Sequence, residues 1–190
     1  MLKEFFIEVI ADQIKECTKC NLSKSRMNAS PGDGPFDADL FLCGEGNGAE
    51  EDRTGKVFVG PAGNLLTKYL KYIDIDRKNV FISNVVHCRP PGNRNPSLEE
   101  VACCIPYVEE QIKVINPKVL LLLGSVALKS LFKDQSIGIM RQRGRWQDYN
   151  GIPTMATFHP AFLLRQTDER FKDQVKEDLK KVKSKLGEDL

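Results

Sequence analysis

The 190-residue sequence has little net charge, only two histidines and no long apolar run. Lys and Arg total 28 against 26 Asp and Glu, a formal charge of +2. This balance excludes a globally basic nucleic-acid coat, although not a local basic face. The longest aliphatic run, from Val119 to Leu123, is far shorter than the roughly 20 residues of a membrane helix. Acids interrupt the first apolar stretch, which is untypical of a signal peptide, so we expect a cytoplasmic protein.

Six cysteines are many for such a chain. Disulfides rarely persist in the cytosol, so metal binding or catalysis is the commoner use of cysteine there. Cys17 and Cys20 form a C-x₂-C pair, and Cys88, Cys103 and Cys104 follow far downstream. A redox pair normally begins a helix after a strand, whereas this pair follows a predicted helix. Thiolates from three segments predict a zinc site or an iron–sulfur cluster, and their spacing does not decide between the two.

Apolar periodicity alternates between two kinds of element along the chain. Helices are expected at residues 2–16, 65–72, 98–115, 125–131 and 168–186. Strands are expected at residues 38–43, 80–86, 118–124 and 152–158. The segment 141–151 is expected to be a polar connection. This alternation predicts an α/β fold with a mainly parallel sheet, in a single domain that covers residues 1–190.

A glycine-rich loop follows the first expected strand. Gly44-x-Gly46-x-x-Ala49 is similar to a dinucleotide-binding fingerprint, which needs a helix directly afterwards and an acid about 20 residues on. We expect residues 50–63 to break any helix, and residues 64–69 contain no acid. The sequence therefore argues against dinucleotide binding. It also argues against a P-loop, because the Ser or Thr that would meet magnesium is missing after Lys56.

Polar side chains are expected at one edge of the sheet. The acidic glycine loop ends the first strand, Asn84 ends the second, and His159 follows the fourth. Open α/β sheets bind their ligands at the carboxyl ends of the strands. A single core Asn or His is usually structural. An acidic loop, an amide and an imidazole at the same edge predict a functional site.

Three rare segments in this order resemble the family 4 uracil-DNA glycosylases, the iron–sulfur branch of that superfamily. The segments are GKVFVGPAG at 55–63, NVVHCRPPGNR at 84–94 and FHPA at 158–161. The likeness runs from Cys17 to about Arg165. It implies a three-layer α/β/α sandwich with a central four-stranded parallel sheet. It also implies a monomeric DNA-repair hydrolase that excises uracil from single- or double-stranded DNA in base excision repair.

The resemblance also implies a structural [4Fe–4S] cluster. Its ligands would be Cys17, Cys20, Cys88 and Cys104. Cys104 is favoured over Cys103 because the family's cysteine stands two residues before a proline, here Pro106. Cys103, together with Cys43 in the first expected strand, would then be a packing residue.

The implied chemistry removes a flipped-out base and adds water to the sugar. Phe58 would stack on the uracil, Asn84 would bond its Watson–Crick edge, and His159 would donate a hydrogen bond to the departing anion. Glu45, with Glu51 as a second candidate, would position water or balance positive charge on the sugar. The substrate pocket would also include Gly44, Gly46 and Asn47.

DNA contact needs local cations despite the small net charge. The candidates are Arg89, Arg94, Arg143, Arg145 and Arg165. Such residues usually form only a solvated surface, but these border the expected site. The segment 162–165 is expected either to wedge into the gap that the flipped base leaves or to belong in part to the core.

The family's first motif usually reads Gly-Glu-Ala-Pro-Gly, whereas residues 44–48 read Gly-Glu-Gly-Asn-Gly. Losing the proline frees one φ angle and adds a backbone donor. The change is expected either to lower the rate or to let Asn47 hold water and alter specificity. His87 stands where the family often has lysine, and we expect it at the surface.

Two alternatives to uracil excision remain at this point. One is a relative with the same fold and either another base specificity or covalent trapping of the abasic product. The other is an iron–sulfur DNA-binding protein without catalysis. The sequence identifies no replication-clamp partner.

Overall fold

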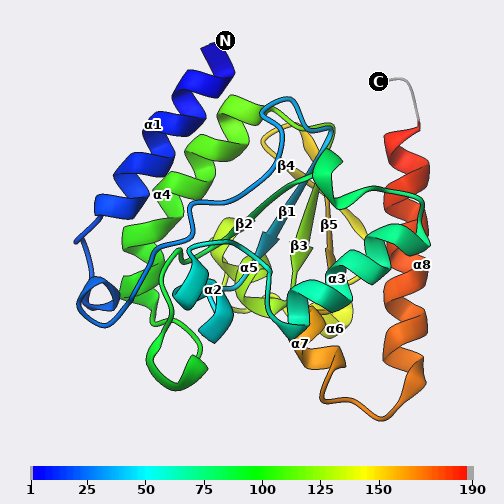
Figure 1. Cartoon of the computed structure of the whole chain (residues 1–190). Helices are drawn as coiled ribbons and strands as arrows, with labels where there is room; N and C mark the ends of the chain where they lie inside the picture. Colours follow the sequence, from blue (N-terminus) through cyan, green and yellow to red (C-terminus); the bar gives the residue numbers. More distant parts are fainter. Residues whose placement is uncertain (1, 188–190) are drawn as a thin grey trace.

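The computed structural model describes residues 2–187, whose strands form one five-stranded sheet in the order β2-β1-β3-β5-β4 (Figure 1). The strands are β1 (Leu40–Gly44), β2 (Phe81–Asn84), β3 (Val119–Leu123), β4 (Trp146–Tyr149) and β5 (Ile152–Thr157). Strands β2, β1, β3 and β5 are parallel, and β4 pairs antiparallel with β5. The predicted parallel sheet is therefore confirmed, with one antiparallel strand added at its edge.

Helices cover both faces of this sheet (Figure 1). They are α1 (Leu2–Glu16), α2 (Ala49–Thr54), α3 (Pro61–Tyr72), α4 (Leu98–Ile115), α5 (Ser125–Leu131), α6 (Ile139–Gln142), α7 (Pro160–Leu163) and α8 (Glu169–Leu186). Three short 3₁₀ turns are η1 (Asn21–Lys24), η2 (Arg77–Asn79) and η3 (Pro91–Asn93). Among residues 2–187, no helix is both long enough and apolar enough to cross a membrane.

The alternation of side chains along a strand builds two cores. Leu120 and Leu122 of β3 pack in one cluster with α1, α4 and α5. Leu121 and Leu123 face the other way, in a second cluster with α3, α7 and α8. Because β3 is buried on both faces, its sequence is a continuous apolar run rather than an alternating one.

The unpredicted strand β4 lies inside the segment expected to be a polar connection. Its side chains alternate between exposed and half-buried, so it lacks the apolar pattern of the central strands. It joins β5 through Asn150 and Gly151, whose φ angles are 53° and 85°. Positive φ at both turn residues is the geometry of a type I′ hairpin, for which Asn-Gly is the favoured pair. The Asn150-Gly151 pair was the sequence signal for this hairpin that the prediction missed.

A second difference concerns the glycine loop. The prediction that residues 50–63 break any helix was wrong, because α2 begins at Ala49 and α3 begins at Pro61. Gly55, with a φ of 71°, ends α2 after six residues. Such a short helix carries too little periodicity to be recognised from sequence.

The order of the strands places a crevice at one edge of the sheet. β1 lies between β2 and β3. The connection after β1 leads to β2 on one side of β1, whereas the connection after β3 leads to β5 on the other side. Ligands bind to open α/β sheets at such switch points, beyond the carboxyl ends of the strands. The loops after Gly44, Asn84, Leu123 and Thr157 all meet there.

Candidate active site

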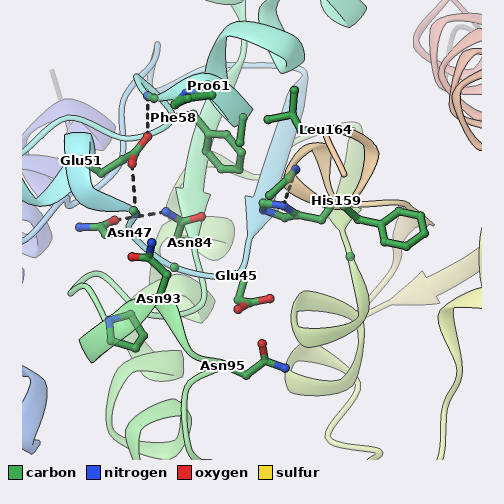
Figure 2. Close-up of a pocket in the computed structure, with 18 of the residues that line it drawn as sticks. Glu45, Asn47, Glu51, Phe58, Pro61, Asn84, Asn93, Asn95, His159 and Leu164 are labelled. Atoms are coloured by element: carbon green, nitrogen blue, oxygen red, sulfur yellow. Dashed lines mark hydrogen bonds between the residues drawn. The ribbon is translucent and has the colours of Figure 1, made fainter. Parts of the chain in front are cut away.

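A cavity of about 730 Å³ lies at this edge, lined by the loops that follow β1, β2, β3 and β5 (Figure 2). Its volume is typical of a small-molecule site. The cavity brings together most of the substrate and catalytic residues predicted from sequence. They are Glu45, Gly46, Asn47, Glu51, Phe58, Asn84 and His159.

Phe58 is held in a strained conformation. Its φ is 49°, in the left-handed region that non-glycine residues rarely adopt. Arg77 donates to the carbonyl oxygens of Val57 (2.7 Å) and Phe58 (2.8 Å). A Cβ atom on Gly63 would lie 1.9 Å from the Phe58 carbonyl oxygen, so only glycine permits this approach. These contacts hold the strained backbone in place, and the Phe58 ring centroid lies 5.7 Å from that of His159.

Glu51 secures the same loop. Its carboxylate accepts hydrogen bonds from the backbone N–H groups of Gly48 (3.0 Å), Val59 (2.8 Å) and Gly60 (2.8 Å). These bonds tie the start of α2 to the start of α3, on either side of Phe58. These bonds give the Glu51 carboxylate a positioning role, while its expected action on water or on positive charge of the sugar stays a prediction. Arg77 also acts on Phe58, and no motif pointed to it.

Asn84 ends β2 directly opposite Gly44 of β1. A Cβ atom on Gly44 would lie 2.4 Å from Asn84 Oδ1 and 2.6 Å from the Phe58 ring, so glycine makes room for both side chains. Asn84 Nδ2 donates to Asn47 Oδ1 (3.3 Å). Among the described residues, the buried Asn84 Oδ1 has no hydrogen-bond partner. A buried polar atom without a partner is costly, unless a ligand satisfies it.

His159 presents a second unpartnered atom. The backbone N–H of Ala161 donates to its Nδ1 (3.1 Å), so the proton of the neutral ring sits on Nε2. Nε2 is shielded from solvent and has no partner among the described residues. Burial, aided by the positive charge of Arg165, lowers the pKa of the imidazole to about 4. At neutral pH the ring is uncharged and offers an N–H group to the cavity.

Glu45 lies at the same cavity, across from His159 in Figure 2. Burial raises the pKa of its carboxyl group, and the positive charge of Arg165 opposes this shift. Arg165 follows α7 at the rim of the cavity. One guanidinium group thus favours both the anionic form of Glu45 and the neutral form of His159.

The cysteines gather elsewhere, between α1, η1, the segment after β2 and α4. One small cavity is bordered by five of them, Cys17, Cys20, Cys88, Cys103 and Cys104. Arg26 donates to the Cys88 sulfur (3.0 Å), and the His87 N–H donates to the Cys104 sulfur (3.4 Å). The Cys103 thiol instead donates to the Lys19 carbonyl (3.4 Å).

All six cysteines are free thiols. Burial raises the pKa of Cys20 and Cys88, and it raises the pKa of Cys104 to about 12. Within residues 2–187, no group of three or more His, Cys, Asp or Glu side chains is arranged to hold a metal ion. The chemistry of the donors fits an iron–sulfur cluster, since thiolates are its usual ligands and N–H groups already point at two of these sulfurs.

His87 lies beside these cysteines and is 1% exposed, so its expected surface position was wrong. Its Nδ1 lies 2.9 Å from the Ser30 carbonyl oxygen. A carbonyl can only accept, so the proton of this ring sits on Nδ1. Burial lowers the pKa of His87 to about 4, which leaves it neutral.

The predicted DNA-binding arginines divide into two groups. Arg143 forms a buried ion pair with Asp178 of α8 and also donates to the Gln174 carbonyl (2.8 Å). Its guanidinium is occupied inside the protein, which corrects its assignment to the DNA surface. Arg94 pairs with Glu100 but remains half exposed. Arg145 and Arg165 are exposed, and Arg89 donates to Asn93 (2.8 Å).

Comparison with known proteins agrees with this geometry. The profile of the Uracil DNA glycosylase superfamily matches residues 31–183. The chain belongs to this superfamily. It is 42% identical to the type-4 uracil-DNA glycosylase of Thermotoga maritima over 183 residues, which cover 96% of this chain and 95% of that protein.

A second type-4 uracil-DNA glycosylase, from Saccharolobus solfataricus, is 39% identical over 95% of this chain and 87% of its own length. The type-5 enzyme of Thermus thermophilus is only 26% identical, over 83% of this chain and 80% of its own. The higher identities place this chain with the type-4 members of the superfamily, as the three sequence segments indicated.

Proposed function

We propose that this protein removes uracil from DNA by hydrolysis of the N-glycosidic bond. One observation carries the proposal. Asn84 Oδ1 and His159 Nε2 are buried, lack partners among the described residues, and border one cavity beside the Phe58 ring. A planar base with hydrogen-bonding edges would satisfy both atoms and stack on the ring. A base reaches such a pocket when its nucleotide flips out of the duplex or comes from a single strand.

In the reaction, the bond between the sugar C1′ and uracil N1 breaks, and its electron pair leaves with the base. A water molecule adds to C1′ and gives up a proton, and the uracil anion gains one. The neutral His159 would donate its Nε2–H to a carbonyl oxygen of the departing uracil, where negative charge develops. One such preorganised donor typically contributes about a 100- to 1,000-fold rate increase.

Glu45 would act on the sugar side of the bond. As a carboxylate it favours positive charge on the sugar and can accept a hydrogen bond from the attacking water. Arg165 helps to keep it ionised despite burial. Gly44 lets Asn84 and Phe58, which would hold the base, pack against β1, and Gly46 lets the loop pack closely on Val86.

DNA would approach across the rim of the cavity. The phosphates would be contacted by Arg89, Arg94, Arg145 and Arg165, while Arg143 is engaged internally.

In the segment 162–165, Leu163 belongs to the core, and Phe162 packs against Phe158 and Phe171. Leu164 is 51% exposed at the cavity and would fill the gap left by the flipped base.

A [4Fe–4S] cluster held by Cys17, Cys20, Cys88 and Cys104 is the further part of the proposal. When bound, it would supply structure rather than chemistry, joining α1, the segment after β2 and α4. The thiols also favour the reducing cytoplasm as the place of action. We infer a single domain over residues 1–190 that acts as a monomer.

The proposal is tested with labelled oligonucleotides that contain uracil, thymine, cytosine, hypoxanthine or xanthine. We expect abasic sites from uracil and none from thymine. Release of another base in preference to uracil, or a covalent protein–DNA adduct, would replace the proposal with an altered relative. DNA binding without release of any base would identify a non-catalytic DNA-binding protein.

A further inference from the structure

Asn47 replaces the proline of the usual family motif, and it contacts Asn84 at the wall of the cavity that would hold the base (Figure 2). We propose that Asn47 is a positioning residue, which fixes the orientation of the Asn84 amide and thereby the preference for uracil over cytosine. This inference rests on the proposed function, in which Asn84 reads the Watson–Crick edge of the base.

The orientation of Asn47 is decided by a backbone carbonyl. Its Nδ2 lies 2.8 Å from the His87 carbonyl oxygen and 2.8 Å from Ser30 Oγ. A carbonyl oxygen can only accept, so the amide nitrogen must face it, and the two ends of the Asn47 amide cannot be exchanged. Asn47 is 3% exposed, which leaves bulk water no access to compete for these bonds.

The His87 peptide that sets this orientation is itself anchored. The Ser30 N–H also donates to the His87 carbonyl (2.9 Å), and the His87 N–H donates to the Cys104 sulfur (3.4 Å). The carbonyl therefore stays in place when a base enters the pocket.

The fixed Asn47 then fixes Asn84. Asn47 Oδ1 is the end left facing Asn84, and an amide oxygen can only accept. Asn84 must present its NH₂ group, at 3.3 Å. Its Oδ1 is consequently the atom left buried and unpartnered beside the cavity. The chain of contacts runs from a carbonyl through two amides to the base.

This orientation suits uracil and opposes cytosine. Uracil offers a donor at N3 and an acceptor at O4, whereas cytosine offers an acceptor at N3 and a donor at N4. Asn84 Oδ1 can accept from uracil N3–H, while the second hydrogen of its NH₂ group can reach O4. To match cytosine, the Asn84 amide would have to reverse and set its oxygen against Asn47 Oδ1. That reversal would replace a hydrogen bond with two facing oxygens.

The test measures base preference rather than rate. Non-cleavable oligonucleotides with 2′-fluoro-deoxyuridine or 2′-fluoro-deoxycytidine are titrated with the full-length protein, and the two dissociation constants are compared. We expect Asn47→Ala and the near-isosteric Asn47→Leu to reduce the uracil preference by roughly tenfold, the equivalent of about one hydrogen bond. Leu keeps the site filled where Ala leaves a cavity.

Two matched variants control for packing. Asn47→Asp keeps an oxygen acceptor for Asn84 but loses the donor to His87, so it should retain the preference within about threefold while lowering thermal stability. Ser30→Ala removes the other Asn47 contact and leaves the carbonyl, and it should also keep the preference. Equal weakening of both ligands in the Ala and Leu variants would overturn the role of Asn47. A wild-type protein that does not prefer uracil would instead overturn the proposed function.

Discussion

The two histidines of the chain stand in two different regions and in opposite tautomers. His87 borders the cysteine cavity and donates through Nδ1–H to the Ser30 carbonyl. His159 borders the base pocket and accepts at Nδ1 from the Ala161 N–H. In both rings burial lowers the pKa to about 4, and in both Nε2 lacks a partner among the described residues.

The difference lies in the backbone group that faces each ring. A carbonyl leaves His87 with a lone pair on Nε2, which cannot stabilise a developing anion. An N–H group leaves His159 with a proton on Nε2, which can. Equal burial and equal pKa therefore do not give equal function, because the local backbone decides whether a neutral imidazole donates or accepts.

The largest effect is expected in the cysteine region, from Cys88→Ser. If a cluster joins α1, the segment after β2 and α4, its binding energy is part of the folding energy, so losing a ligand should cost on the order of 5 kcal/mol. The visible absorbance near 400 nm expected of a [4Fe–4S] centre should disappear. Iron content, the visible spectrum and the thermal midpoint measure these changes.

Cys103→Ser is the matched control, because Cys103 is not among the proposed ligands and its thiol donates to the Lys19 carbonyl. It should keep the absorbance and most of the stability. Equal losses in the two variants would contradict the proposed ligand set. A wild-type protein that contains no iron and lacks the absorbance near 400 nm would show that this region holds no such cluster.

In the base pocket, His159→Ala should lower single-turnover excision of uracil by about 100- to 1,000-fold. Affinity for uracil-containing DNA should fall far less, because the donor acts mainly on charge that develops during the reaction. Single-turnover kinetics and binding to a non-cleavable analogue separate the two quantities.

His159→Gln supplies an amide N–H and should recover part of the loss. Parallel losses of affinity and rate in His159→Ala would show that the residue only packs the pocket.

Lower pH should destabilise both regions. Each imidazole has a folded pKa of about 4 and an unfolded value near 6.5. The unfolded chain therefore binds more protons than the folded one below pH 6.5, and stability falls as the pH drops toward 4. The loss amounts to at most about 3 kcal/mol for each histidine. Urea unfolding at a series of pH values measures it, and a flat profile over this range would rule out buried neutral rings.

The smallest effect is expected from His87→Leu, which sharpens the contrast with His159. The variant leaves the Ser30 carbonyl without its side-chain donor and should cost about 1 to 2 kcal/mol. It should also flatten part of the pH dependence of stability, and its effect on stability should exceed its effect on the excision rate. A 100-fold loss of rate in a folded variant would give His87 a role in the chemistry.

Much of the fold was readable from the sequence because its signals are local. Ser97 and Glu100 form a capping box, a pattern carried by four consecutive residues, and the helix that they start ends at Ile115 as expected. The buried strand β3 was recognised from its unbroken aliphatic run. The edge strand β4 was missed, since its half-exposed side chains carry no such pattern.

The site was only partly predictable. Asn84 ends one recognisable strand and His159 follows another, and their shared edge could be deduced from the parallel sheet. The role of Arg77 could not be deduced, because its partners, the Val57 and Phe58 carbonyls, are nearly twenty residues away. Arg143 was grouped with DNA-binding cations, although its partner Asp178 lies on the last helix.

The sequence by itself determined the fold class, the type-4 branch and the residues that gather at the carboxyl edge of the sheet. Helix caps, apolar runs and rare motifs each lie within a short stretch of the sequence, so they can be recognised without the tertiary structure. The tertiary structure alone decided the His87 tautomer, the use of Glu51 as a backbone anchor and the orientation of Asn47. These depend on which lone pair meets which N–H group between residues far apart in the chain, separated by 40 positions for Asn47 and His87 and by 57 for Ser30 and His87.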